Sequence, residues 1–264
     1  MTDTGRIVAV TGASSGIGLA AARLFRDRGD KVYCLSRTDP KEPGITFIHT
    51  DVTDEASVNA AFGAIGKAEG RIDVLLSNAG IGVSGAAECT TMQDAKRQLD
   101  VNFFGLHACV RAAVPLMRAH GGTILATSSV AAVFAIPFQA FYSASKFAVN
   151  ALVLALANEL KPFNIRVAAI MPGDVKTGFT GARIKAEEDD NYGQSIEKSV
   201  AVMERDEQNG MGPEMIAKRF VALSLKKHPK VLSTVGLQYK FFCFLGKVLP
   251  IRLQNFIVGK MYIK

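Results

Sequence analysis

Short runs of β-branched and apolar residues alternate along the chain with longer stretches of helical spacing. The runs predict strands at residues 6–11, 31–35, 45–52, 72–77, 122–128 and 165–171, with a last candidate at 231–235. The longer stretches predict helices at residues 19–28, 54–66, 95–119 and 141–160, and Asp54 is a candidate N-cap. Strands that alternate with helices predict an α/β fold, a doubly wound parallel sheet with right-handed crossovers.

Residues 177–199 interrupt this alternation. Gly178, Gly181 and Gly193 punctuate the segment, and the acidic run at 187–190 is typical of a solvated turn. An irregular segment directly after a strand often covers a ligand site, so we expect residues 178–212 to form a lid over the substrate. A further helix is predicted from residue 212 to residue 225.

The composition is that of an ordinary folded domain. With 264 residues, 48% hydrophobic and 21% charged, the chain can bury a large core, and we treat residues 1–264 as one domain. We expect neither a signal peptide nor a spanning helix, because no run of about 18 uninterrupted apolar residues occurs. The histidines lack ligand spacing, so no metal site is predicted. Four cysteines without paired spacing favour reduced thiols and a cytoplasmic location: Cys34, Cys89, Cys109 and Cys243.

The net charge of +7 is unevenly distributed. All 24 acidic residues precede Met215, whereas ten Lys or Arg residues follow it. Because these cations stand singly among apolar residues, they differ from a nucleic-acid-binding arm, and we predict no nucleic-acid partner. Residues 237–264 form an apolar and basic C-terminal extension with two open interpretations. The extension either contacts a membrane peripherally or supplies a helix that covers the substrate pocket or a subunit contact.

A glycine-rich turn joins the first predicted strand to the first helix. The turn has the spacing G-x-x-x-G-x-G and includes Gly12, Ser14, Ser15, Gly16, Ile17 and Gly18. Glycines let the backbone approach a ligand closely, and the helix N-terminus offers free N–H groups and a positive dipole end. We therefore expect the turn to hold a phosphate group of a dinucleotide.

The ends of the next strands carry further candidates for this ligand. No acidic residue stands at the end of the second strand, where Ser36 and Arg37 follow Leu35, so Arg37 favours NADP(H) over NAD(H). The third strand leads to Asp51 and Val52, and the fourth to Asn78, Ala79 and Gly80. Since ligands of such sheets bind outside the carboxyl ends of the strands, these residues are expected to lie around one site.

Tyr142 and Lys146 lie four residues apart in a predicted helix, which places both side chains on one face. A neighbouring ammonium favours the phenolate, so we expect Lys146 to lower the pKa of Tyr142 from its ordinary value of about 10. Such a pair can pass a proton to or from a carbonyl or alcohol oxygen. Ser129 ends the fifth strand, and Asn102 stands inside a helix, where Asn is disfavoured unless its side chain has a partner.

Together these motifs resemble the short-chain dehydrogenase/reductase family in its single-domain form, most strongly over residues 6–177. The resemblance implies a Rossmann fold and an NADP(H)-dependent oxidoreductase that acts on CH–OH groups. It implies a catalytic tetrad of Asn102, Ser129, Tyr142 and Lys146. It also implies contacts with the nicotinamide amide from Pro172, Gly173, Val175 and Thr177.

The resemblance also implies a role for each member of the tetrad. Tyr142 would be the acid–base group, and Ser129 would hydrogen-bond the substrate oxygen. Lys146 would hold the nicotinamide ribose and lower the tyrosine pKa, while Asn102 would fix a water that connects Lys146 to solvent. The glycine-rich turn has Ser14 and Ser15 where some NADP-using relatives carry a basic residue, which leaves Arg37 as the main evidence for NADP(H).

The substrate is expected to be apolar. Phe134 and Phe138 lie between Ser129 and Tyr142, and Phe179 begins the predicted lid. The extension is similar to those of hydroxysteroid and retinol dehydrogenases, so we hypothesise a hydroxysteroid or a similarly bulky lipophilic alcohol or ketone. The alternatives are a 3-oxoacyl-thioester reductase and a non-catalytic NADPH-binding sensor. The family resemblance also implies a homodimer or homotetramer.

Overall fold

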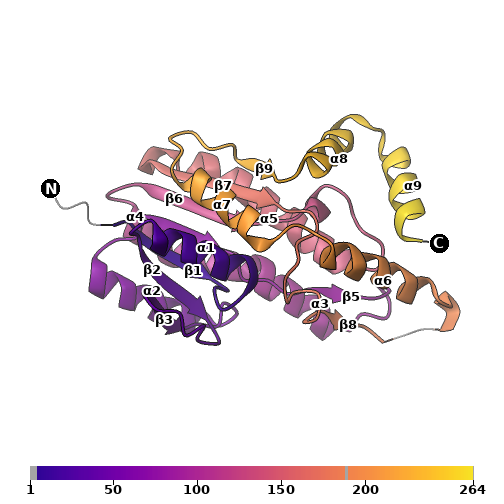
Figure 1. The fold of residues 1–264 in the computed structure, drawn as a ribbon, viewed down its shortest axis with the longest axis horizontal. Helices are drawn as coiled ribbons and strands as arrows, with labels where there is room; N and C mark the ends of the chain where they lie inside the picture. The colour runs from indigo at the N-terminus through magenta and orange to yellow at the C-terminus, as the bar shows by residue number, and fades with distance from the viewer. Residues whose placement is uncertain (1–4, 188–189, 264) are drawn as a thin grey trace.

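The computed structural model describes residues 5–187 and 190–263. Within these residues a seven-stranded sheet has the order β3-β2-β1-β4-β6-β7-β9, and every neighbouring pair is parallel (Figure 1). The chain starts in the middle of the sheet, builds one half outward, and returns to build the other. The predicted doubly wound α/β fold is confirmed. The strands are β1 (Ile7–Thr11), β2 (Lys31–Ser36), β3 (Ile45–His49), β4 (Val74–Ser77), β6 (Gly122–Thr127), β7 (Ile165–Met171) and β9 (Leu232–Thr234).

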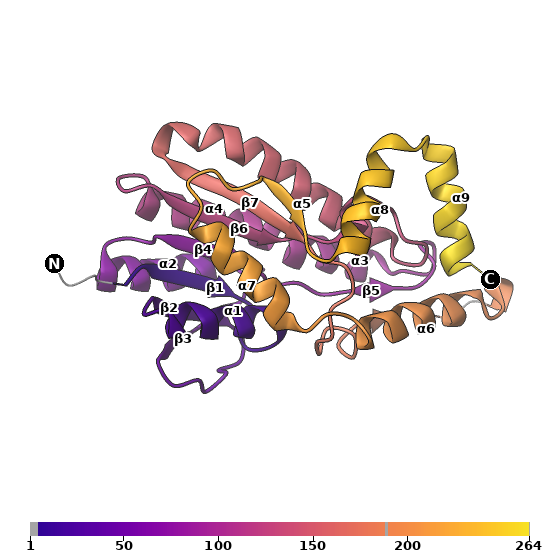
Figure 2. The same ribbon diagram turned by 45° about the horizontal axis from the view of Figure 1, so that its top comes forward.

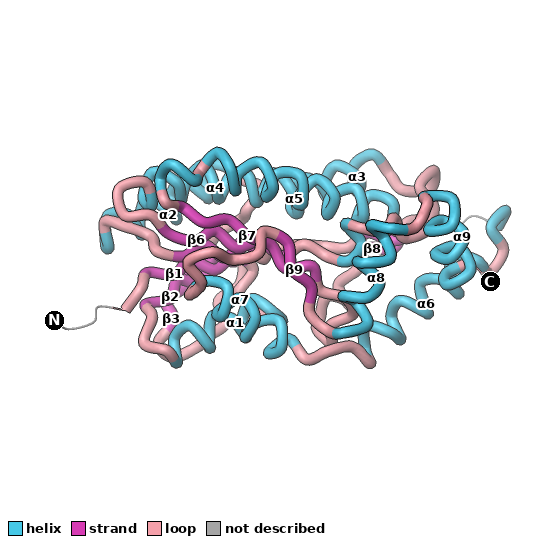
Figure 3. Tube along the Cα trace, turned by 90° about the horizontal axis from the view of Figure 1, so that it is seen from above, coloured by secondary structure: helices cyan, strands magenta, loops and turns pink. Residues whose placement is uncertain are grey.

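Helices cover both faces of the sheet, so side chains of both faces are buried (Figure 3). On β1, Val8 and Val10 point to one core, and Ile7 and Ala9 point to the other. Because both faces are buried, the strand sequences are nearly continuous apolar runs and do not alternate between apolar and polar residues. The first core is covered by α1 (Gly16–Asp27) and α7 (Pro213–Ser224), and the second by α2 (Glu55–Glu69), α4 (Gly105–Met117) and α5 (Ala140–Glu159).

The predicted N-cap of α2 is confirmed, whereas the third strand is shorter than predicted. The Asp54 side chain accepts a hydrogen bond from the backbone N–H of Ala56. β3 ends at His49 rather than at residue 52. The backbone N–H of Asp51 donates to the Ser57 hydroxyl of α2 at 3.0 Å, which turns the chain out of the sheet.

The helix predicted over residues 95–119 is confirmed in part, because a π-helical turn interrupts it. The chain forms α3 (Met92–Leu99), a π-helical turn η1 (Asp100–Phe104) and then α4. The wider turn carries Asn102, which is 3% exposed and hydrogen-bonded through its side chain to Ile81 and Ser145. Asn102 thus has the partners that an interior Asn requires.

The segment predicted as an irregular lid contains more regular structure than expected. It holds β8 (Ile184–Lys185), a 3₁₀ turn η4 (Asp190–Tyr192) and α6 (Ser195–Gln208). β8 pairs in parallel with β5 (Val83–Ser84), a contact between distant residues that periodicity does not reveal. Of the predicted acidic turn, residues 188 and 189 lie outside the described residues.

The C-terminal extension forms two helices, α8 (Leu237–Val248) and α9 (Ile251–Tyr262). Both lie with α6 at the end of the molecule opposite the N-terminus, beyond the carboxyl ends of the strands (Figures 1 and 2). The remaining short turns, η2 (Val130–Ala132) and η3 (Lys161–Phe163), flank α5 in the sequence.

By length and composition, α5 is the one helix of the described chain that could cross a membrane. One face of this helix packs into the core. Val149 and Val153 are 1% exposed and belong to the second core, and the ionisable Lys146 on the same helix is buried.

Candidate active site

The predicted site residues surround one cavity of about 1120 Å³ at the carboxyl edge of the sheet. Pockets for a single drug-sized ligand span roughly 300–1,000 Å³, so this cavity has room for a cofactor together with a substrate. The predicted residues that line it are Gly12, Ser14, Ser15, Gly16, Ile17, Ser36, Arg37, Asp51, Val52, Asn78, Ala79, Gly80, Ser129, Phe134, Tyr142, Lys146, Pro172, Gly173, Val175, Thr177 and Phe179.

Three predicted residues are absent from the described lining of this cavity: Gly18, Asn102 and Phe138. Gly18 packs against the Gly12 carbonyl group and the Asn78 side chain, and Asn102 lies behind the residues that line the cavity. Phe138 has a positive φ of 58°, and its ring contacts the Tyr192 ring at a centroid distance of 5.9 Å. This turn directs the neighbouring Gln139, rather than Phe138, to the cavity, which corrects the expectation for Phe138.

The glycine-rich turn has the shape of a phosphate-binding cradle. Gly12 and Gly16 adopt φ values of 64° and 55°, which favour glycine. A Cβ at Gly12 would lie 2.8 Å from the Ala79 Cα, and a Cβ at Gly18 would lie 2.4 Å from the Gly12 oxygen. Ser15 makes no side-chain cap bond to α1, and the first turn of α1 contains no acidic residue. The N–H groups of this helix start are therefore available to an anion, so the residues present fit a dinucleotide phosphate.

The far end of the cavity carries Arg37 and Asp51. Arg37 is exposed at the end of β2, while the Ser36 hydroxyl donates to the Thr38 carbonyl oxygen at 2.7 Å. Asp51 Oδ1 accepts from the backbone N–H and the hydroxyl of Thr53 at 2.9 and 2.7 Å. Burial would raise the pKa of Asp51, but these hydrogen bonds and the Arg37 charge outweigh it and hold the pKa below its ordinary value. Asp51 is thus an ionised acceptor at neutral pH.

Two threonines outside the predicted set of site residues hold the turn after β4. The Thr11 hydroxyl accepts from the backbone N–H groups of Asn78 and Ala79 at 2.9 and 3.1 Å. The Thr127 hydroxyl donates to Asn78 Oδ1 at 3.0 Å. Thr11 and Thr127 are the last residues of β1 and β6, so their position at carboxyl strand ends was the signal that could have identified them.

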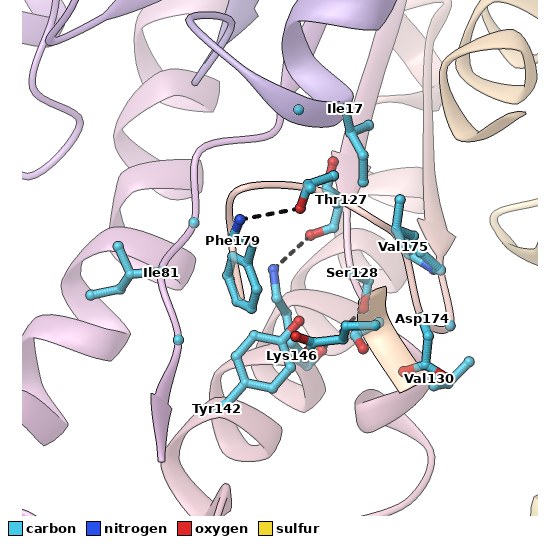
Figure 4. Close-up of a pocket in the computed structure, with 18 of the residues that line it drawn as sticks. Ile17, Ile81, Thr127, Ser128, Val130, Tyr142, Lys146, Asp174, Val175 and Phe179 are labelled. Carbon is cyan, nitrogen blue, oxygen red and sulfur yellow. Dashed lines mark hydrogen bonds between the residues drawn. The ribbon is translucent and has the colours of Figure 1, made fainter. Parts of the chain in front are cut away.

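Tyr142 and Lys146 lie side by side on α5, as predicted (Figure 4). The Lys146 Nζ atom is 5.6 Å from the centre of the Tyr142 ring and donates to the Thr127 carbonyl oxygen at 2.9 Å. The ring of Phe179 lies 5.8 Å from that of Tyr142. The first two turns of α5 therefore direct a phenol and an amine to the same cavity.

The predicted lowering of the Tyr142 pKa is wrong for this arrangement. Burial raises the pKa of Tyr142 to about 12, against a hydrogen bond with Ser129 that lowers it. Burial also lowers the pKa of Lys146 to about 8. Burial thus disfavours the charged form of each group.

Ser129 and Asn102 are positioned by local hydrogen bonds. Ser129 ends the stretch after β6 and caps η2, where its hydroxyl accepts from the Ala131 N–H at 3.1 Å. Asn102 Oδ1 accepts from the Ile81 N–H at 2.9 Å, and Nδ2 donates to Ile81 O and Ser145 Oγ at 3.1 and 3.0 Å. Asn102 thus joins the loop after β4 to the helix that carries Tyr142.

Acidic groups line the cavity near Tyr142, and sequence reasoning missed them. Asp174 accepts from the Tyr239 hydroxyl at 2.7 Å, and burial raises the pKa of Asp174. Glu207 forms an ion pair with Arg183, whose side chain is 1% exposed. The charges of Glu207 and Asp174 both act to raise the pKa of Tyr142. This end of the cavity therefore disfavours a negative charge.

The apolar part of the wall comes from segments far apart in the sequence. Phe134 and Phe179 line it as predicted, together with Met203 of α6. The C-terminal helices contribute Phe242, Leu245, Leu249, Ile257 and Met261. α8 lies so close that a Cβ at Gly246 would be 2.5 Å from Val133 Cγ1. The extension thus covers the pocket, as one of the two interpretations expected, and this packing leaves a membrane contact of its other side as a separate question.

Comparisons with known proteins agree with this geometry. A family model described as short chain dehydrogenase matches residues 6–188. The chain is 39% identical over 236 residues to a 3-ketodihydrosphingosine reductase of Bacteroides thetaiotaomicron, covering 88% of both chains. It is 38% identical over 191 residues to the 17-beta-hydroxysteroid dehydrogenase type 1 of Mus musculus, covering 66% of this chain and 55% of the mouse protein.

Solved structures give the same result. A short-chain dehydrogenase from Streptomyces avermitilis superposes with a TM-score of 0.87, at 27% identity and 98% coverage of both chains. A 3-ketoacyl-(acyl-carrier-protein) reductase from Brucella melitensis complexed with NADH has a TM-score of 0.74, at 25% identity, covering 88% of this chain and 96% of that one. An alcohol dehydrogenase from Thermococcus sibiricus complexed with 5-hydroxy-NADP has a TM-score of 0.72, at 25% identity, covering 87% and 95%.

Proposed function

We propose, on the premise that this chain belongs to the short-chain dehydrogenase/reductase family, that it is an NADP(H)-dependent reductase of long-chain lipophilic ketones. The family assignment itself makes the chain an oxidoreductase that acts on CH–OH groups with a nicotinamide cofactor. The substrate class that we favour is a 3-keto sphingoid base. The observation that carries this choice is the apolar wall that α8 and α9 add to the cavity beside Tyr142.

Arg37 supports the choice of NADP(H). Its guanidinium is exposed at the cavity rim and forms no hydrogen bond or ion pair with other residues of the described chain. No carboxylate stands at the end of β2 to accept from a ribose 2′-hydroxyl, whereas an Arg at this place accommodates a 2′-phosphate. The structural relatives carry either type of cofactor, so the choice of NADP(H) in this proposal rests on Arg37.

Proton transfer is assigned to Tyr142. When bound, a reduced nicotinamide supplies the hydride that attacks the carbonyl carbon. Tyr142 donates its hydroxyl proton to the carbonyl oxygen, and Ser129 donates a hydrogen bond to the same oxygen. With a pKa of about 12, Tyr142 is protonated at neutral pH, which is the form that reduction requires. Lys146, beside the ring, stabilises the phenolate that this step leaves.

The polar lining favours a substrate with a cationic group close to the ketone. Asp174, Asp206 and Glu207 line the cavity; Arg183 pairs with Glu207 and Arg205 pairs with Asp206, which leaves Asp174 without a cationic partner among the described residues. A sphingoid base combines an alkyl chain with an amine next to the carbonyl group. Its chain would pack against Phe242 and the other apolar residues of the wall, while its ammonium would face these carboxylates.

A hydroxysteroid is the second candidate, because the mouse relative is a 17-beta-hydroxysteroid dehydrogenase and because a rigid apolar ring system also suits this wall. A 3-oxoacyl thioester comes third, supported by the Brucella relative alone. Both lack an amine near the ketone, so neither substrate could form an ion pair with the carboxylates of Asp174 and Glu207. A non-catalytic NADPH sensor would not need Tyr142 at all.

Oxidation of NADPH and NADH with a panel of ketones tests the proposal. The panel contains 3-ketodihydrosphingosine, its N-acetyl derivative, several ketosteroids and a 3-oxoacyl thioester, and Tyr142→Phe is the control enzyme. We expect turnover of the free amino ketone with NADPH, with the N-acetyl form at least tenfold poorer in kcat/KM. Turnover of the steroids or the thioester alone would overturn the substrate class. Equal rates with NADH would overturn the cofactor choice.

A further inference from the structure

Helix α8 has two opposite apolar faces. The inner face consists of Tyr239, Cys243 and Gly246, and it packs against the body of the protein. The outer face consists of Leu237, Phe241, Phe244 and Val248, with exposed fractions of 83%, 58%, 58% and 57%. Successive members of each face are three or four residues apart, which places each set along one side of the helix. Packing in the described chain therefore accounts for only one of the two faces.

Helix α9 also exposes large apolar side chains. Val258 is buried, while Ile251, Leu253 and Phe256 are 69%, 43% and 62% exposed. α8 and α9 project from the end of the molecule that carries the cavity, in both views (Figures 1 and 2). We call the exposed apolar residues of this protruding pair of helices the outer face of the extension: Leu237, Phe241, Phe244, Val248, Ile251, Leu253 and Phe256. Apolar patches of this kind on soluble proteins mark interaction sites.

Basic side chains flank the outer face. Lys240 and Lys247 are seven residues apart and share one flank of α8, and Arg252 and Lys260 lie on α9. Lys260 Nζ lies 5.8 Å from the centre of the Phe256 ring. Every acidic residue of the chain precedes Met215, so the extension itself contributes no negative charge. The charge complement of the outer face is a negatively charged surface.

We propose that the outer face of the extension docks on an anionic lipid membrane. Phenylalanine and leucine side chains would enter the headgroup–acyl boundary, and the four basic residues would lie among the lipid phosphates. A second copy of the chain fits less well. In a two-fold symmetric contact the same basic residues would face each other across an apolar patch, and the extension itself has no acidic residue to pair them.

The membrane contact would also place the cavity next to the bilayer. Phe242 and Leu245 of α8 and Ile257 and Met261 of α9 line the cavity, while their neighbours on the same helices form the outer face. A long-chain substrate could then move from the lipid into the cavity along the two helices without crossing water. This consequence rests on the proposed function, whereas membrane docking does not.

The first test uses the absence of tryptophan from the chain. Phe241→Trp introduces a single reporter on the outer face, and Met92→Trp places a control reporter at a 70% exposed position on α3. The full-length proteins are titrated with vesicles of phosphatidylglycerol and phosphatidylcholine, without cofactor or substrate. We expect a blue shift of the Phe241→Trp emission and quenching by brominated lipid, with no change for Met92→Trp. No blue shift for Phe241→Trp, or equal shifts for both reporters, would overturn the proposal.

The second test separates electrostatic docking from simple apolar adhesion. Lys240→Gln with Lys247→Gln is compared with Lys226→Gln and Lys227→Gln, an equally charged pair that is exposed in the loop after α7. Each basic residue at an anionic surface contributes about fivefold to binding. Vesicle flotation should therefore show at least tenfold weaker binding for the first pair and a change below about twofold for the control pair. Equal loss in both pairs would contradict a site on the extension.

Sedimentation velocity without vesicles tests the alternative that a second copy of the chain covers the outer face. If Phe241→Ser with Phe244→Ser dissociated an oligomer, and the wild type did not bind vesicles, the outer face would be a subunit contact and the proposal would be wrong. We expect these two substitutions to abolish vesicle binding and to leave the sedimentation coefficient unchanged. Because no step of these measurements requires turnover, failure of membrane docking and failure of the proposed function are distinguishable.

Discussion

Gly18→Ala is the sharpest test of how the fold builds the cofactor cradle. Gly18 is the third residue of α1, and its φ is not in the left-handed region, so an Ala can adopt the same backbone conformation. The obstacle to the substitution is a steric clash of the added Cβ atom. The new Cβ would lie 2.4 Å from the Gly12 carbonyl oxygen and 2.5 Å from Asn78 Nδ2. An ordinary contact needs about 1 Å more, so the start of α1 must move away from the turn.

The size of the effect follows from two opposing terms. Overpacking costs about 1–3 kcal/mol, and a contact of 2.4 Å with a backbone atom places this cost in the upper part of the range, at about 2–3 kcal/mol. The better helix propensity of Ala returns about 1 kcal/mol at most. We therefore expect a net loss of about 1–2 kcal/mol and a Tm lowered by roughly 2–8 °C. A shift of the N–H groups by about 1 Å would also weaken at least one charge-assisted hydrogen bond to phosphate, which lowers NADPH affinity about tenfold or more.

Gly63→Ala provides the matched control. Gly63 lies exposed inside α2, and a Cβ there would meet no atom within 4 Å. The same chemical change should therefore stabilise the protein by about 1 kcal/mol and leave NADPH affinity unchanged. Thermal unfolding followed by circular dichroism and calorimetric titration with NADPH measure both quantities. If Gly18→Ala kept the wild-type Tm and affinity, or if both substitutions shifted Tm in the same direction, the packing reasoning would be refuted.

Three further substitutions test other parts of the site. Arg37→Gln should weaken NADPH binding about tenfold or more and leave NADH binding within about twofold, as measured by calorimetry; equal losses would contradict a 2′-phosphate contact. Glu207→Gln leaves the buried Arg183 without its ion pair and should cost about 3 kcal/mol in urea unfolding, whereas Glu204→Gln on the same helix breaks a pair with the exposed Lys185 and should cost under about 1 kcal/mol. For Lys146 the folded pKa of about 8 lies below the ordinary value, so between these values the unfolded chain binds the extra proton. The stability of the wild type relative to Lys146→Met should therefore rise as the pH increases from 8 to about 10, and a flat difference would contradict the buried, depressed pKa.

The sequence was sufficient for the parts of the fold that local pattern determines. Each strand of the main sheet was placed within three residues at either end, because strands buried on both faces stand out as apolar runs bounded by glycine or polar residues. Most of the cofactor and catalytic candidates also converge on the cavity, since the carboxyl ends of parallel strands meet at one edge. Tyr142 and Lys146 share a face because helical spacing alone dictates it.

What the sequence did not reveal depends on contacts between distant segments. The pairing of β5 with β8 and the bond from Tyr239 to Asp174 join residues that have no common local pattern. The π-helical turn at Asn102 results from the side-chain bonds of Asn102 to Ile81 and Ser145, not from helix propensity. The pKa of Tyr142 was misjudged for a similar reason, because its burial depends on residues distant in the sequence, such as Phe179.

Proton transfer by Tyr142 is the step on which the proposed function depends, and one comparison tests it directly. Wild type and Tyr142→Phe are saturated with NADPH, mixed with 3-ketodihydrosphingosine, and followed by NADPH absorbance in a single turnover. The phenylalanine variant keeps the ring but lacks the hydroxyl, so it should bind NADPH with wild-type affinity and lose at least about a hundredfold in rate. A Tyr142→Phe rate equal to that of the wild type would contradict the assignment of Tyr142 as the proton donor.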